Sequence, residues 1–99
     1  MALASEPQVL LITGCSTGLG RSLAEDALAR GLRVIATARR LSAIGDLQAK
    51  GARILTLDVD DTPERLQSFA VEAVGAYGQV DILINNAGWL LAGAIEENT

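Results

Sequence analysis

Short apolar runs that alternate with helical segments constrain the fold of this chain more than any other feature. The runs 8–13, 33–38, 53–58 and 80–85 have the length of strands and are rich in Val, Ile, Leu and Ala. Nearly continuous apolar residues are typical of strands that are covered on both faces, as in a parallel sheet. We therefore predict a doubly wound α/β fold that is truncated after its fourth strand, in the order 3-2-1-4, with residues 1–99 as the N-terminal half of a single domain.

Capping residues and glycines predict where the helices begin and end. We expect a first helix from Leu19 that ends before Gly31, and a short second helix that Ser42 caps and that ends near Lys50. The run Asp61-Thr62-Pro63-Glu64 favours a third helix start, since it combines a capping side chain with a first-turn proline and an acid. The expected apolar faces are Leu19, Leu23, Ala24, Ala27 and Leu28 in the first helix, and Leu66, Phe69, Ala70, Ala73, Val74 and Tyr77 in the third.

Charge and composition exclude several classes of function. A net charge of −4 argues against nucleic-acid binding, which needs clustered Lys and Arg, and Arg39-Arg40 is the one dense basic spot. Cys15 is the single cysteine and the chain has no histidine, so we expect neither an internal disulfide nor a metal site. No apolar run is long enough to span a membrane, and we expect a cytoplasmic protein.

A glycine-rich loop, Thr13-Gly14-Cys15-Ser16-Thr17-Gly18-Leu19-Gly20, joins the first strand to the first helix. Gly14 permits a tight exit from the strand, Gly18 lets the backbone approach a phosphate, and Gly20 lets the helix pack against the sheet. The spacing G-x-x-x-G-x-G is neither the G-x-G-x-x-G fingerprint nor a P-loop. The alternative is a strand–helix turn without a ligand. The strand before the loop and the amphipathic helix after it favour a nucleotide site in a Rossmann-type sheet.

The end of the second strand indicates which nicotinamide cofactor would bind. An acid there would hold the ribose 2′-hydroxyl of NAD, whereas an arginine accommodates the 2′-phosphate of NADP. The strand ends without an acid, and Arg39 and Arg40 follow. A guanidinium matches a phosphate in charge and geometry, so we predict NADP, with NADPH preferred over NADH. The alternative is a solvated arginine pair on a loop.

Three motifs in order resemble those of the classical short-chain dehydrogenase/reductase family: Thr13-Gly14-x-x-x-Gly18-x-Gly20, Asp58-Val59 and Asn85-Asn86-Ala87-Gly88. The resemblance covers essentially the whole chain. It implies cofactor contacts from Ser16, Thr17, Gly18 and Leu19 along the pyrophosphate and adenosine ribose, from Arg39 and Arg40 at the 2′-phosphate, from Asp58 and Val59 at the adenine, and from Asn86, Ala87 and Gly88 near the ribose and nicotinamide. The amides of Asn85 and Asn86 have a second interpretation, in which they tie the fourth strand to its neighbours.

The resemblance also implies hydride transfer between a nicotinamide and a small carbonyl or alcohol, with a Tyr-x-x-x-Lys pair and a Ser as catalytic residues. Tyr77 is the only tyrosine, Asp81 stands four residues after it, and Lys50 is the only lysine. We therefore expect no catalytic residue in this chain and no activity from it alone. Residues 36–40 resemble family branches that act on lipophilic alcohols and ketones.

Three hypotheses remain open. The chain is the N-terminal part of an NADPH-dependent reductase or dehydrogenase, a truncated non-catalytic remnant, or an interaction module that uses an open sheet edge.

Overall fold

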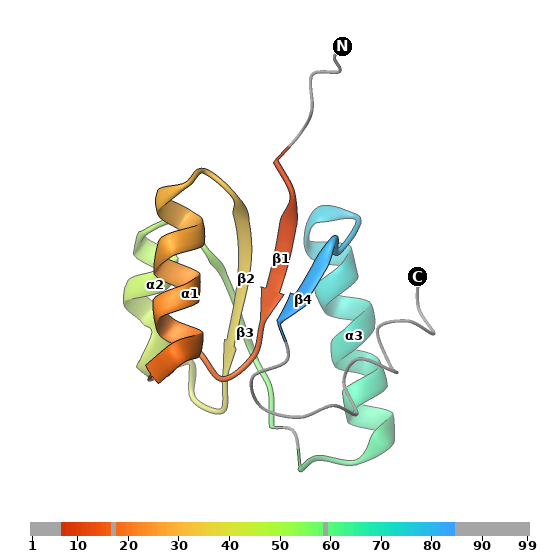
Figure 1. Ribbon diagram of the computed structural model, residues 1–99. Coiled ribbons are helices and arrows are strands. Elements are labelled where there is room, and N and C mark those ends of the chain that lie inside the picture. The colour runs from red at the N-terminus through yellow and green to blue at the C-terminus, as the bar shows by residue number, and fades with distance from the viewer. Residues whose placement is uncertain (1–6, 17, 59, 85–99) are drawn as a thin grey trace.

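The computed structural model describes residues 7–16, 18–58 and 60–84. Within these ranges, strands and helices alternate along the chain (Figure 1). The elements are β1 (Val9–Ile12), α1 (Gly18–Ala29), β2 (Arg33–Ala38), the 3₁₀ helix η1 (Leu41–Ile44), α2 (Gly45–Ala49), β3 (Arg53–Thr56), α3 (Pro63–Tyr77) and β4 (Ile82–Ile84).

The described strands form one parallel sheet in the order β3-β2-β1-β4. This order confirms the predicted 3-2-1-4 arrangement. β1 lies between two partners, with Leu11 opposite Ile35 of β2 and Leu83 of β4. All four residues of β1 are buried, as the continuous apolar run predicted. The glycine loop leaves this central strand at its carboxyl end.

Helices cover both faces of the sheet and create two cores. In Figure 1, α1 and α2 lie on one side of the strands and α3 lies on the other. Successive residues of β1 alternate between the two cores: Leu10 and Ile12 pack with α1 and α2, whereas Val9 and Leu11 pack with α3. This burial on both faces explains why the strand sequence is apolar throughout instead of alternating with polar residues.

The ends of α3 follow the sequence prediction. Thr62 is the N-cap, and its hydroxyl accepts a hydrogen bond of 3.3 Å from the backbone N–H of Arg65. Pro63 occupies the first turn, where its missing N–H costs nothing. Gly78 ends the helix at a φ of 86°, a left-handed conformation that glycine adopts without strain.

Two helix predictions were wrong. Ser42 does not cap a helix, because η1 begins one residue earlier, at Leu41, and Arg40 precedes it without a side-chain cap. Leu19 is not part of the buried face of α1: it is 65% exposed, whereas Gly20, Ala24 and Ala27 are buried. Leu19 lies in the first turn of a helix that begins at Gly18, and Gly20 faces the sheet in its place.

Both edge strands are shorter than predicted. β3 ends at Thr56 and β4 spans Ile82–Ile84, whereas the apolar runs extended to about 58 and 80–85. The central strand β1 is shorter as well, since it spans Val9–Ile12 whereas its apolar run covered 8–13. β4 lies at one edge of the described sheet. Ile82 is 39% exposed on this edge. Among the described helices, none has the length and apolar character needed to cross a membrane.

Candidate nucleotide-binding site

The glycine loop turns sharply at the carboxyl end of β1. Gly14 has a φ of 67° and Gly18 a φ of 64°, which lie in the left-handed region that other residues rarely adopt. No described neighbour lies within 4 Å of the position that a Cβ of Gly18 would occupy. Conformation, rather than contact with the protein, therefore requires a glycine here, and the space over Gly18 is open to a ligand.

Buried hydrogen bonds hold the underside of the loop against β2. The Cys15 N–H donates to the carbonyl of Thr37 over 2.8 Å, and the Cys15 thiol donates to the carbonyl of Ile12 over 3.2 Å. The Thr37 hydroxyl donates to the same Ile12 carbonyl over 3.3 Å. Cys15, Thr13 and Thr37 are fully buried. The loop is thus anchored from below, as its small residues allow.

The thiol of Cys15 is a packing group. Burial raises its pKa above the ordinary value of 9.0, and this outweighs the lowering by the Thr37 backbone hydrogen bond and by the nearby charge of Arg21. The start of a helix close by does not overcome desolvation here. The thiol is therefore protonated at neutral pH and serves packing.

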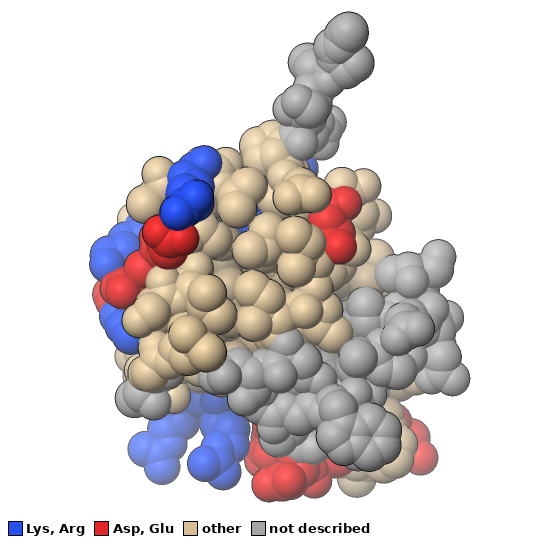
Figure 2. Space-filling model, in the orientation of Figure 1, with Lys and Arg blue, Asp and Glu red and all other residues tan. Residues whose placement is uncertain are grey.

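A cleft of about 450 Å³ opens beside the loop, at the carboxyl end of β2. Its lining residues are Ser16, Ala38, Arg39, Arg40 and Ala43. Ser16, Arg39 and Arg40 were predicted site residues, and the fold brings them together from two segments. Figure 2 shows basic side chains at the lower edge of the molecule, where the loop after β2 lies in Figure 1.

The two arginines of this cleft are open to solvent. Arg39 and Arg40 are exposed, and no described acid forms an ion pair with either guanidinium. By contrast, three other described arginines each lie within 4.0 Å of a carboxylate: Arg21, Arg30 and Arg65. The cleft therefore presents positive charge that no acid among the described residues neutralises.

Asp58 follows β3 at the same end of the sheet and is half-buried. Its Oδ1 accepts a hydrogen bond of 2.9 Å from the N–H of Asp60, which closes a tight turn. Next to it, the Leu57 N–H donates to the carbonyl of Ala38 over 3.0 Å, and this bond brings the turn beside the cleft. One carboxylate oxygen thus shapes the turn, and Oδ2 accepts no hydrogen bond from a described residue.

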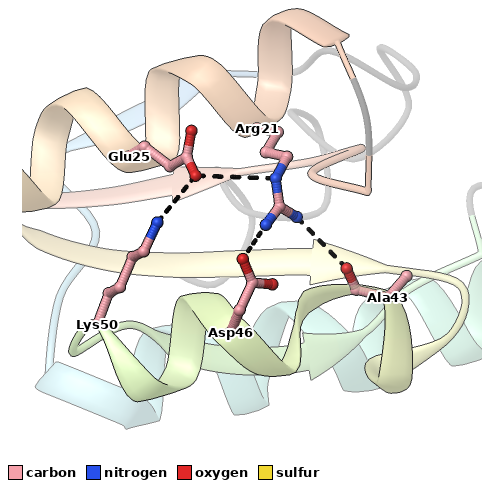
Figure 3. A network of polar contacts seen from close by, with 5 residues as sticks. All are labelled: Arg21, Glu25, Ala43, Asp46 and Lys50. Carbon is pink, nitrogen blue, oxygen red and sulfur yellow. Dashed lines mark hydrogen bonds and ion pairs between the residues drawn. The ribbon is translucent and has the colours of Figure 1, made fainter.

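Arg21 connects the cleft to the helices behind it, and the sequence analysis assigned it no role. Its guanidinium contacts Glu25, Asp46 and the carbonyl of Ala43, and Lys50 joins the network through Glu25 (Figure 3). The i,i+4 spacing of Arg21 and Glu25 was visible in the sequence. The contacts with Asp46 and Ala43 depend on the fold, because these residues are 25 and 22 positions away.

Several predicted site residues lie outside the described residues, namely Thr17, Val59, Asn86, Ala87 and Gly88, together with Asn85. Of the remaining predictions, Leu19 is exposed in the first turn of α1 and Gly20 is buried in the same helix. In the part of the chain that the structure describes, no cluster of three or more Cys, His, Asp or Glu side chains could hold a metal ion.

Tyr77 lies far from the cleft in the topology of the sheet. Its ring packs beneath two guanidinium groups, with 5.5 Å from the ring centre to Arg33 and 5.3 Å to Arg53. Arg33 and Arg53 are the first residues of β2 and β3, so they mark the amino end of the parallel sheet. The cleft is at the carboxyl end. Tyr77 is therefore a packing residue.

Comparisons with known proteins agree on one family. The family model described as short chain dehydrogenase matches residues 8–99. The chain is 41% identical over 86 residues to the 3-oxoacyl-[acyl-carrier-protein] reductase FabG of Escherichia coli, an alignment that covers 84% of this chain and 35% of that protein. The chain thus spans about a third of the length of this relative.

Solved structures show the same likeness. A short-chain dehydrogenase from Streptomyces avermitilis superposes with a TM-score of 0.79 at 45% identity, covering 86% of this chain and 32% of that one. An actinorhodin polyketide ketoreductase crystallised with NADPH gives a TM-score of 0.70 at 35% identity, over 84% of this chain and 34% of that one. The sheet order, the glycine loop and these matches together show that the chain belongs to the short-chain dehydrogenase family.

Proposed function

We propose that residues 1–99 are the cofactor-binding part of an NADP(H)-dependent oxidoreductase that reduces a small carbonyl or oxidises an alcohol. The observation that carries the proposal is the cleft beside the glycine loop, where Arg39 and Arg40 present guanidinium groups without a described acidic partner. A guanidinium binds phosphate through charge and paired N–H donors. The NADPH in the related ketoreductase structure supports the same cofactor class.

The remaining cofactor contacts are proposed from the family motifs. Ser16, Gly18 and Leu19 would bind the pyrophosphate side, and Asp58 would bind the adenine amino group through the carboxylate oxygen that does not close its turn. Arg39 and Arg40 would hold the 2′-phosphate. Thr17, Val59, Asn86, Ala87 and Gly88 would complete the site. The nicotinamide, when bound, supplies hydride to a carbonyl carbon or accepts it from an alcohol.

The proposed working compartment is the cytoplasm, since the described cysteine, Cys15, is a free thiol. The substrate would be a small and lipophilic carbonyl or alcohol. A nucleic-acid partner does not fit a net charge of −4.

Titration of the chain with NADPH and NADH tests the proposal. We expect NADPH to bind at least about tenfold more tightly, because a charge-assisted phosphate contact contributes about 1.5–3 kcal/mol. The readouts are nicotinamide fluorescence and the midpoint of thermal unfolding. Arg39→Asp should abolish the preference for NADPH without weakening NADH binding, because an acid at this position can hold the ribose 2′-hydroxyl of NADH.

Arg30→Asp is a matched control for charge. Arg30 follows α1, which runs back from the glycine loop, so it lies at the amino end of the sheet, and it pairs with Asp26 over 2.9 Å. The same change in net charge there should leave the preference intact. Equal Kd values for NADPH and NADH in the parent chain, or an unchanged ratio in Arg39→Asp, would contradict the proposed 2′-phosphate site.

The chain alone should not turn over substrate. Tyr77 is covered by Arg33 and Arg53 at the amino end of the sheet, and Lys50 pairs with Glu25 on the helical face. Neither group can act as a proton donor at the cleft. We expect no oxidation of NADPH, followed by its absorbance, with any ketone tested. Measurable turnover that Tyr77→Phe abolishes would overturn this assignment.

A further inference from the structure

The guanidinium of Arg21 joins three segments of the chain. On its own helix it lies 3.8 Å from Glu25 Oε2. Across the helix interface it pairs with Asp46 of α2, and its Nη1 donates to the carbonyl of Ala43 in η1 over 3.4 Å. Figure 3 shows the Arg21 side chain pointing from α1 toward both partners on the neighbouring segment.

The contact with Ala43 leads directly into the cleft. Ala43 lines the cleft together with Arg39 and Arg40, and its N–H donates to the carbonyl of Arg40 over 3.1 Å. The turn at η1 begins without a side-chain cap. Arg21 is therefore connected to the backbone of Arg40 through a single residue, Ala43. Its hydrogen bond holds a turn that has no side-chain N-cap.

The charge of Arg21 is compensated inside the network. Asp46 accepts a hydrogen bond from Arg21, Glu25 forms an ion pair with the same guanidinium, and Lys50 lies 3.0 Å from Glu25, so two cations face two carboxylates. The Arg21 side chain is 27% exposed. Arg39 and Arg40 are exposed, and within residues 7–16, 18–58 and 60–84 no acid pairs with either of them. The structure thus contains two kinds of arginine around one cleft: one held between helices and two open to a ligand.

We propose that Arg21 is a positioning residue that sets cofactor specificity: by holding Ala43 and α2 against α1, it fixes the loop that carries Arg39 and Arg40. This inference rests on the proposed 2′-phosphate site. Arg21 acts on the phosphate-binding arginines through the backbone and does not itself touch the phosphate.

Binding of both cofactors to four variants tests the proposal. Arg21→Gln should raise the Kd for NADPH about three- to fivefold and leave the Kd for NADH within about twofold, which matches the size of an exposed ion-pair contribution. Asp46→Asn should act in the same direction, because it releases the guanidinium from α2. Arg21→Lys should fall between the parent chain and Arg21→Gln, since one ammonium cannot hold all three partners.

Arg30→Gln is the matched control. Arg30 directly follows α1 and pairs with Asp26 at i,i+4 spacing. Within the described residues it forms no hydrogen bond or ion pair with η1 or α2. It should leave both Kd values unchanged. A second readout needs no cofactor: amide hydrogen exchange at Ala43 should be faster in Arg21→Gln than in the parent chain, whereas exchange in β1 and β2 should not change.

The outcomes separate the two proposals. No preference for NADPH in the parent chain would refute the 2′-phosphate site and this inference with it. A parent preference that Arg21→Gln does not reduce, even with faster exchange at Ala43, would refute the positioning role alone. Weaker binding of both cofactors in Arg21→Gln, together with tighter binding in Asp46→Asn, would identify Arg21 as a direct phosphate ligand and overturn the proposal.

Discussion

The two ends of the sheet are built differently. At the amino end, side chains close over the strands: Asp81 accepts a hydrogen bond of 2.7 Å from the Val9 N–H, and Tyr77 packs beneath Arg33 and Arg53. At the carboxyl end, the Cys15 N–H bonds to the Thr37 carbonyl beneath the glycine loop, and Arg39 remains open to solvent. The comparison teaches that the amino end contributes stability and leaves the carboxyl end available for a ligand, as in other open α/β sheets.

The largest expected effect is on the reaction rate of the Cys15 thiol. This rate tests whether the glycine loop at the carboxyl end is packed against the sheet on its underside. Its thiol is fully buried and its pKa is raised by desolvation. Reaction with an aromatic disulfide should be at least about a hundredfold slower in the folded chain than in urea. Similar rates in both states would mean that the carboxyl end is open on its underside as well.

The same thiol gives a pH dependence with a defined sign. The folded-state pKa of Cys15 is higher than the unfolded value, so its stabilising contribution is present below about pH 9 and is lost as pH rises through the folded-state pKa. Urea unfolding of the parent chain should therefore lose more free energy above about pH 9 than Cys15→Ala. Parallel pH profiles would contradict the raised pKa.

Removal of Asp81 should be the largest single loss of stability among the contacts at the amino end. The Val9 N–H belongs to a fully buried residue, and Asp81→Ala would leave it without its carboxylate acceptor. We expect a loss of about 1–2 kcal/mol in urea unfolding. Asp58→Ala, which removes the exposed turn contact at the carboxyl end, should cost less than about 0.5 kcal/mol. Equal losses would remove the contrast between the two ends.

Two glycines with similar conformations offer a matched pair. Gly18 and Gly78 have φ values of 64° and 86°, and neither has a described atom within 4 Å of a would-be Cβ. Alanine at either position should destabilise the fold by about 1 kcal/mol through backbone strain. Gly18→Ala should in addition weaken NADPH binding, measured by fluorescence, whereas Gly78→Ala should not. If both variants lost NADPH binding, the cause would be unfolding of the chain and not the loss of a contact between Gly18 and the ligand.

The smallest effect is expected at Tyr77. Tyr77→Leu keeps the apolar contact with the core below α3 but removes the aromatic face from Arg33 and Arg53. Partly exposed cation–π contacts contribute about 0.5–1 kcal/mol each, so a loss of about 1 kcal/mol is an upper bound. Cofactor affinity should not change, because the ring is at the other end of the sheet. A change in the ratio of NADPH to NADH binding would refute this separation.

Local signals in the sequence predicted the fold well where each residue acts on its neighbours. The cap at Thr62, the stop at Gly78 and the apolar run of β1 all depend on nearby backbone, and the structure confirms them. The prediction that Ser42 caps a helix was wrong, because the presence of a capping residue type does not determine where a short 3₁₀ turn begins. The prediction that Leu19 is buried was wrong, because apolar spacing alone does not indicate which turn of α1 extends beyond the sheet.

The candidate site was predicted in part. The cleft brings together Ser16, Arg39 and Arg40, which the glycine loop and the end of the second strand had indicated. Contacts between distant segments were not predictable from spacing. Arg21 meets Asp46 only because α1 and α2 cover the same face, and Asp81 meets Val9 only because β4 pairs with β1.

The central position of β1 also has a consequence for the order of folding. The pairing of Leu10 with Ile82 and the bond between Val9 and Asp81 join residues that are 72 positions apart. Such distant contacts carry a large loop-closure entropy and slow the search for the native state. Among the described strands, β1 is the first to be synthesised, yet one of its edges waits for the last of them, β4. β1 can join β2 early, so the docking of β4 is the step that completes the described part of the sheet.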